Sequence, residues 1–161
     1  METARLCLTT KVVTTEEDMK MNYEKSIAYL EELQRFGIQP GLERIIRLLE
    51  LMKNPHNGLK YIHVAGTNGK GSTASFLASI LKHSGLRVGV YTSPHLIRFN
   101  ERITINETAS LSDVQISDED VSRLTGQIAG HIESSGLEIT YFEATTALAF
   151  AYFAEKSPDF V

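Results

Sequence analysis

Residues 61–73 read Tyr-Ile-His-Val-Ala-Gly-Thr-Asn-Gly-Lys-Gly-Ser-Thr, and they join a short apolar run to a glycine-rich turn. The run at residues 61–65 predicts a buried β-strand. Residues 72–83 predict a helix that buries four apolar side chains: Phe76, Leu77, Ile80 and Leu81. Residues 87–91 predict a second strand. A strand, a helix and a strand within ~30 residues form a βαβ unit, so we expect a parallel sheet flanked by helices, an α/β fold.

The glycine-rich turn has the composition of a phosphate-binding loop. Glycines allow a backbone with positive φ, whose N–H groups can converge on phosphate oxygens. The N-terminus of the following helix adds partial positive charge, and a lysine adds a full one. The residues predicted to hold the phosphates of ATP are Gly66, Thr67, Asn68, Gly69, Lys70, Gly71 and Ser72.

The turn departs from the common phosphate-loop pattern at two positions. Val64 stands where that pattern has its first glycine, and Gly71 stands where it has a hydroxyl. The alternative interpretation is a glycine-rich turn between a strand and a helix, with an exposed lysine. Three glycines, a lysine and two hydroxyls between a strand and a helix favour phosphate binding.

Helical spacing of apolar residues predicts four further helices outside the βαβ unit. They cover residues 22–36, 42–52, 117–135 and 143–155. The second is expected to bury one face of apolar side chains: Leu42, Ile45, Ile46, Leu49 and Met52. Residues 102–106 alternate like a short strand, and residues 158–161 begin a third apolar strand. Because a domain rarely ends on the first residues of a strand, we expect the chain to be part of a longer protein.

Composition excludes several classes of protein. The chain has 161 residues, 42% of them hydrophobic, and a net charge of −4, which is typical of a globular domain without nucleic-acid partners. No apolar run approaches the ~18 residues that span a bilayer, so no membrane partner is expected. One cysteine, Cys7, permits no internal disulfide. The expected location is the cytoplasm.

Three motifs resemble the folylpolyglutamate synthase/dihydrofolate synthase family of the Mur-ligase superfamily. The first is His-Val-Ala-Gly-Thr-Asn-Gly-Lys-Gly-Ser-Thr at residues 63–73; the others are residues 90–96 and 100–103. The likeness extends from about Tyr23 to Val161 and includes residues 41–44 and 140–143. It implies a Mur-ligase-like ATP-binding domain with a parallel sheet, of which residues 22–161 would be the N-terminal part, with residues 1–21 a flexible arm.

The resemblance implies an ATP-dependent ligase that joins L-glutamate to folate, to dihydropteroate or to both. ATP would phosphorylate the folate carboxylate, and the amine of glutamate would attack the resulting acyl phosphate. The family implies catalytic roles for Lys70 and Glu143 and Mg²⁺ binding by Ser93 and Glu143. The residues alone leave an alternative for each of these two side chains. Ser93 would be a turn hydroxyl before Pro94, and Glu143 would be an acid at a helix N-terminus, favoured by the helix dipole.

The loop at residues 92–102 is expected to contact the pterin substrate through His95, Arg98 and Arg102. The family expectation is a monomer. Because the resemblance implies further ligands and a glutamate-binding domain beyond Val161, we expect the chain alone to be inactive. Two alternatives remain: a Mur-type ligase for another carboxylate, and a non-catalytic nucleotide-binding module.

Overall fold

The computed structural model describes residues 21–106 and 112–161, so the predicted arm lies outside the described residues except for Met21. The longer helices are α2 (Tyr23–Glu32), α3 (Glu43–Leu51), α4 (Lys70–His83), α5 (Asp118–Ser135) and α6 (Tyr141–Lys156). Two 3₁₀ turns, η1 (Leu33–Phe36) and η2 (Phe99–Arg102), lie between them. The strands are β1 (Gly89–Tyr91), β2 (Ile103–Asn106) and β3 (Asp113–Gln115). None of the described helices is both long and apolar enough to span a membrane.

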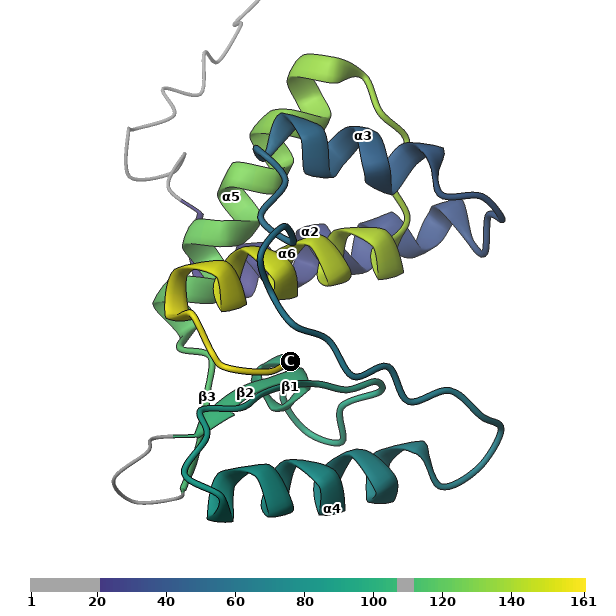
Figure 1. Ribbon diagram of the computed structural model, residues 1–161. Coiled ribbons are helices and arrows are strands. Elements are labelled where there is room, and N and C mark those ends of the chain that lie inside the picture. Colours follow the sequence, from purple (N-terminus) through teal and green to yellow (C-terminus); the bar gives the residue numbers. More distant parts are fainter. Residues whose placement is uncertain (1–20, 107–111) are drawn as a thin grey trace, which may run out of the picture.

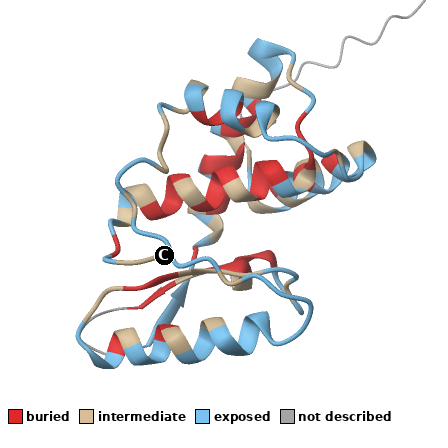
Figure 2. Cartoon of the chain, turned by 45° about the vertical axis from the view of Figure 1, so that its right-hand side comes forward, coloured by how far each residue is buried: buried red, intermediate tan, exposed pale blue. Residues whose placement is uncertain are grey.

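The molecule is layered, with the sheet between α4 on one face and the remaining long helices on the other (Figure 1). Helices α2, α3, α5 and α6 pack together, and their apolar faces form the main core with the side chains of β2. Buried residues are concentrated in α6, whereas most of α4 is exposed (Figure 2). Only Ala78 and Lys82 of α4 are buried.

The three assigned strands form an antiparallel sheet in the order β1-β2-β3. Gly89 pairs with Ile105, and Ile105 pairs with Val114. The expected parallel sheet appears only as short pairings beside β1, where Val88 forms a parallel bridge with Phe160. Strands β1 and β2 were predicted, but their antiparallel pairing was not, and β3 was missed because it is three residues long and exposed, so its sequence carries no apolar alternation.

The predicted strand at residues 61–65 is wrong as a buried strand. The segment is extended and pairs with the last residue: Ile62 N–H donates to the Val161 carbonyl at 2.9 Å, and Val161 N–H donates to the Lys60 carbonyl at 2.8 Å. It is not assigned as a strand, and four of its five residues are exposed. Within the described residues, too few neighbouring residues pack against this apolar segment to bury it.

The predicted burial on two helices also needs correction. On α4, Phe76 is 71% and Ile80 is 63% exposed, although both were expected in the core. On α3 the buried pair is Leu48 and Leu49, while Leu42 and Ile46 are exposed. Both helices exist as predicted, but periodicity could not show which apolar face meets the core.

The other helices agree with the sequence. Ser117 caps α5 by accepting from the Asp120 N–H, and Val121, Leu124 and Ile128 are fully buried. In α6, four residues at helical spacing are buried, as the predicted helix over residues 143–155 requires: Ala144, Ala147, Leu148 and Ala151. These helices form the platform on which the glycine-rich loop and β1 are placed.

Candidate functional site

The glycine-rich loop connects the extended segment at residues 61–65 to the first turn of α4. Gly69 has φ +75°, a left-handed conformation that glycine adopts without strain, and it stands at the N-cap of α4. No side chain caps this helix end, so N–H groups of the first turn remain available. The loop is exposed from Ala65 to Thr73. An exposed helix N-terminus of this kind can bind an anion.

Lys70 folds back over the loop. Its Nζ donates to the carbonyl of Gly66 at 2.8 Å and to the carbonyl of Thr67 at 3.2 Å. These two bonds hold the ammonium on the same side as the loop. A triphosphate placed there would meet a full positive charge beside the helix N-terminus, and phosphate binding by this loop stays a prediction.

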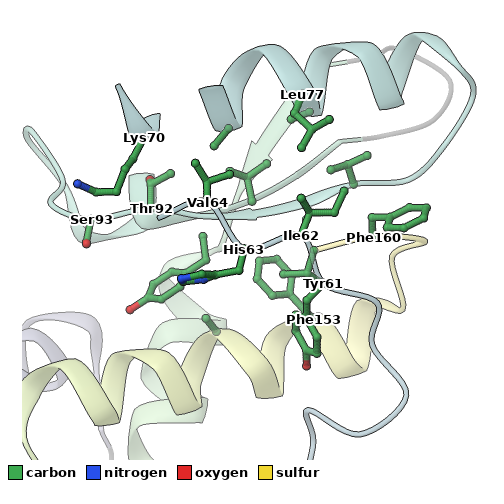
Figure 3. Close-up of a pocket in the computed structure, with 18 of the residues that line it drawn as sticks. Tyr61, Ile62, His63, Val64, Lys70, Leu77, Thr92, Ser93, Phe153 and Phe160 are labelled. Atoms are coloured by element: carbon green, nitrogen blue, oxygen red, sulfur yellow. The ribbon is translucent and has the colours of Figure 1, made fainter. Parts of the chain in front are cut away.

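A cavity of about 750 Å³ extends from the loop between α4 and α6. Lys70 and Ser93 both line it, although they are 23 positions apart in the sequence. Figure 3 shows the two side chains at the same end of the cavity, beside Thr92. The fold therefore brings the lysine of the loop and the hydroxyl after β1 into one site.

Glu143 occupies a different position, outside the residues that line this cavity. Its Oε2 accepts from the N–H of Thr140 at 2.9 Å and from the Thr140 hydroxyl at 2.8 Å, which closes a capping box at the start of α6. Its Oε1 lies 3.2 Å from Nη2 of Arg44. The carboxylate is thus held by a helix cap and an ion pair, and metal binding by Glu143 stays a prediction.

Arg102 and His95 form a pair beside the loop that follows β1. Arg102 Nε donates to His95 Nδ1 at 2.8 Å, which places the imidazole proton on Nε2. The Arg102 guanidinium, largely buried, also lies over the ring of Tyr141, 5.4 Å from its centroid. The structure brings these two residues together, and substrate contact by either of them stays a prediction.

Arg98 is separate from this pair. Its Nη2 donates to both carboxylate oxygens of Asp118 at 2.8 Å, and its guanidinium lies over the ring of Tyr23. The hydrogen bond to Asp118 raises the pKa of Arg98 above its usual value. These contacts anchor the loop to α2 and α5 and leave a substrate role for Arg98 a prediction.

The donor atoms at the cavity fit a magnesium ion only in part. Mg²⁺ prefers oxygen ligands and keeps several waters or phosphate oxygens. Ser93 offers a hydroxyl, but the described residues contain no cluster of three or more His, Cys, Asp or Glu side chains that could hold a metal. An ion here would depend on phosphate oxygens and on few protein ligands.

Sequence reasoning missed the role of Arg44. Residues 41–44 were singled out for their resemblance only, yet Arg44 joins α3 to the start of α6 through Glu143 and also donates to the carbonyl of Gln39 in the preceding loop. One partner of this contact, Glu143, could have been identified as a helix-capping residue from the Thr-x-x-Glu pattern at residues 140–143, which is a capping-box signature.

Similarity to known proteins extends over most of this chain. It is 40% identical over 144 residues to the dihydrofolate synthase/folylpolyglutamate synthase of Bacillus subtilis, covering 86% of this chain and 32% of that protein. It is 40% identical over 117 residues to the dihydrofolate synthetase of Saccharomyces cerevisiae, covering 73% of this chain and 26% of that protein. The chain thus spans about a third of these relatives or less. No family model matches it.

Solved structures of proteins with the same names also match this chain. The folylpolyglutamate synthetase of Lactobacillus casei superposes with a TM-score of 0.77 at 38% identity, over 87% of this chain and 35% of that one. The folylpolyglutamate synthase of Thermotoga maritima superposes with a TM-score of 0.74 at 43% identity, over 86% of this chain and 31% of that one. A complex of FPGS with AMPPCP and folate superposes with a TM-score of 0.73 at 36% identity, over 87% of this chain and 34% of that one. The described fold is therefore that of these α/β ligases.

Proposed function

Because this chain is homologous to folylpolyglutamate and dihydrofolate synthases over most of its length, we propose that it supplies the ATP-phosphate site of such a ligase. The observation that carries this proposal is the position of Lys70. Its ammonium lies over the glycine-rich loop, at the uncapped N-terminus of α4 and at the same end of the cavity as Ser93. The site would hold the phosphates at Gly66–Ser72.

The reaction of the whole ligase is part of the same proposal. A carboxylate oxygen of folate or dihydropteroate attacks the γ-phosphorus of ATP, and the bond to the bridging oxygen breaks to release ADP. The amine of L-glutamate then attacks the acyl carbon, and phosphate leaves with the electrons of the C–O bond. Lys70 and the loop N–H groups would balance the negative charge that moves between the phosphate oxygens.

Two further groups would assist. A bound Mg²⁺ would neutralise phosphate charge, with the Ser93 hydroxyl as one protein ligand. The paired His95 and Arg102 would face the carboxylate-bearing substrate, since a guanidinium binds carboxylates through paired hydrogen bonds. Support for folate over another acid comes from the similar proteins described above, which are named as folylpolyglutamate or dihydrofolate synthases.

Nucleotide binding by the chain tests the proposal. Titration of the chain with a fluorescent ATP analogue in the presence of Mg²⁺ should give saturable binding. Lys70→Ala should weaken binding about 10–100-fold, as expected for the loss of a charge-assisted contact of ~1.5–3 kcal/mol. Lys25→Ala, which removes a lysine from α2 in the other layer, should leave affinity unchanged. Equal affinity of the two variants would contradict the assignment of the phosphate site.

A further inference from the structure

Asn100 lies at the centre of a polar network in the loop at residues 92–102. It is only 3% exposed, although asparagine is mostly a surface residue. Its Oδ1 accepts from the Tyr23 hydroxyl at 2.7 Å. Its Nδ2 donates to the carbonyl of Ile116 at 2.6 Å and to Oδ1 of Asp118 at 2.9 Å. Both donors of the amide group are therefore used, and so is its oxygen.

The three partners of Asn100 belong to elements outside the loop. Tyr23 is the first residue of α2, Ile116 directly follows β3, and Asp118 is the first residue of α5. They are 77, 16 and 18 positions away from Asn100 in the sequence. The three hydrogen bonds therefore fix the short turn η2, which contains Asn100, against the helical layer.

Arg102 lies on a different face of the same turn. Side chains three residues apart lie above one another in a 3₁₀ helix, so Phe99 and Arg102 share a face and Asn100 points elsewhere. The Arg102 guanidinium accordingly lies 6.0 Å from the centroid of the Phe99 ring. A rotation of the turn that moved Asn100 away from Tyr23 would therefore also move Arg102 away from His95.

The burial of Phe99 alone does not set this rotation. Phe99 is 3% exposed and belongs to the core, but apolar contact has no preferred direction. Hydrogen bonds weaken steeply when their angles change, so the three bonds of Asn100 specify one orientation of η2.

We propose that Asn100 is a positioning residue, which holds η2 in the orientation that lets Arg102 donate to Nδ1 of His95. The inference deepens the proposed function and rests on it, because that function has the His95–Arg102 pair face the carboxylate-bearing substrate. Asn100 itself would touch no substrate, since it is buried and its amide is bonded to three protein groups. Helices α2 and α5 would thus support the substrate loop through this one side chain.

The test follows the bond between Arg102 and His95 by NMR in the 161-residue chain, without nucleotide or substrate. Hydrogen exchange of the Arg102 Nε–H should be slow, and the imidazole nitrogens of His95 should show the Nε2–H tautomer. Asn100→Ala should accelerate this exchange at least about tenfold, because three hydrogen bonds are lost. Asn106→Ala is the matched control: Asn106 is fully buried in β2 and hydrogen-bonded through its amide, but away from η2. It should change the exchange less than about twofold.

A milder pair of variants decides the question if Asn100→Ala does not fold. Tyr23→Phe removes one hydroxyl from the network and keeps the ring that packs against Arg98, so exchange at Arg102 should become roughly 2–10-fold faster. Tyr29→Phe changes the same helix, but the Tyr29 hydroxyl has no hydrogen-bond partner among the described residues, so exchange should stay the same. The acceleration should persist without urea dependence, which identifies local opening of the loop rather than global unfolding.

Fast exchange of the Arg102 Nε–H in the unchanged chain would overturn the proposal. So would unchanged exchange in Asn100→Ala or Tyr23→Phe, equal acceleration by the control variants, or an acceleration confined to the urea-dependent exchange, which would show a merely structural role. A chain that binds the ATP analogue but lacks the coupling would contradict only the positioning role. A chain with the coupling but without nucleotide binding would contradict only the proposed function.

Discussion

The ion pair between Arg44 and Glu143 is the residue-scale contact that most affects the site. Glu143 is only 7% exposed, and removing Arg44 would leave its carboxylate with Thr140 as the one remaining partner that the described contacts show. Breaking a fully buried pair costs ~3–5 kcal/mol. Since the Arg44 side chain is 21% exposed, we expect Arg44→Ala to lower the free energy of unfolding by about 2 kcal/mol in urea denaturation.

Arg47→Ala is the matched control for this prediction. Arg47 lies on the same helix and pairs with Glu50 at 2.9 Å, but both side chains are about half exposed. The loss should be below about 0.5 kcal/mol, because surface ion pairs contribute little. Similar losses for Arg44→Ala and Arg47→Ala would show that the Arg44–Glu143 pair is not structural, and would favour the alternative that Glu143 is available to a metal.

Glu101 is a second residue whose charge orders the loop after β1. The N–H groups of Leu96, Arg98 and Ile97 donate to its carboxylate at 2.8, 2.7 and 3.0 Å. These bonds hold the pKa of Glu101 below its usual value of 4.5. Because the folded-state pKa is the lower one, the stabilisation is complete above about pH 4.5 and disappears as the pH falls through the folded-state pKa.

Amide NMR signals of Leu96, Ile97 and Arg98 should therefore titrate together, with a midpoint below pH 4.5. In Glu101→Gln this common transition should be absent, because the side chain no longer ionises. A midpoint at or above 4.5, or one that persists in the variant, would assign the transition to another group.

At the scale of elements, the contact between β1 and α6 sets how closely the sheet approaches the helical layer. A Cβ built on Gly89 would lie 2.6 Å from Cε1 of Phe153, whose side chain is fully buried. Gly89→Ala should therefore destabilise the fold by ~1–3 kcal/mol through overpacking. Gly130→Ala, where a Cβ meets no atom within 4 Å in helix α5, should stabilise it by ~0.5–1 kcal/mol. Urea denaturation of both variants distinguishes the signs.

How far the sequence predicted each element depends on what covers it. Helices α5 and α6 followed from their apolar periods because the helices that bury them lie within the described residues. The glycine-rich loop and Lys70 were predicted because that chemistry is local to nine residues. The exposed faces at Phe76 and Ile62 could not be predicted, since burial depends on long-range neighbours. The Arg44–Glu143 contact spans 99 positions and leaves no local signal.

On the scale of the whole molecule, the two layers differ in how much of each helix is buried. Nine of the sixteen residues of α6 are buried, compared with two of the fourteen residues of α4. Local opening requires less free energy where fewer apolar contacts are broken. Native-state hydrogen exchange should therefore be slowest in α5 and α6 and much faster in α4.

The urea dependence of amide exchange should also differ between α6 and α4. Amides in the middle of α6 should exchange only through global unfolding, so their opening free energy should equal that from urea denaturation. Amides of α4 should open with a smaller free energy and a smaller urea dependence, because less surface is exposed when that helix detaches. The salt bridge of Lys82 with Asp113 ties the end of α4 to β3, so exchange should be slower near Lys82 than near Thr73. Equal opening energies in α4 and α6 would show instead that the two layers unfold as one cooperative unit.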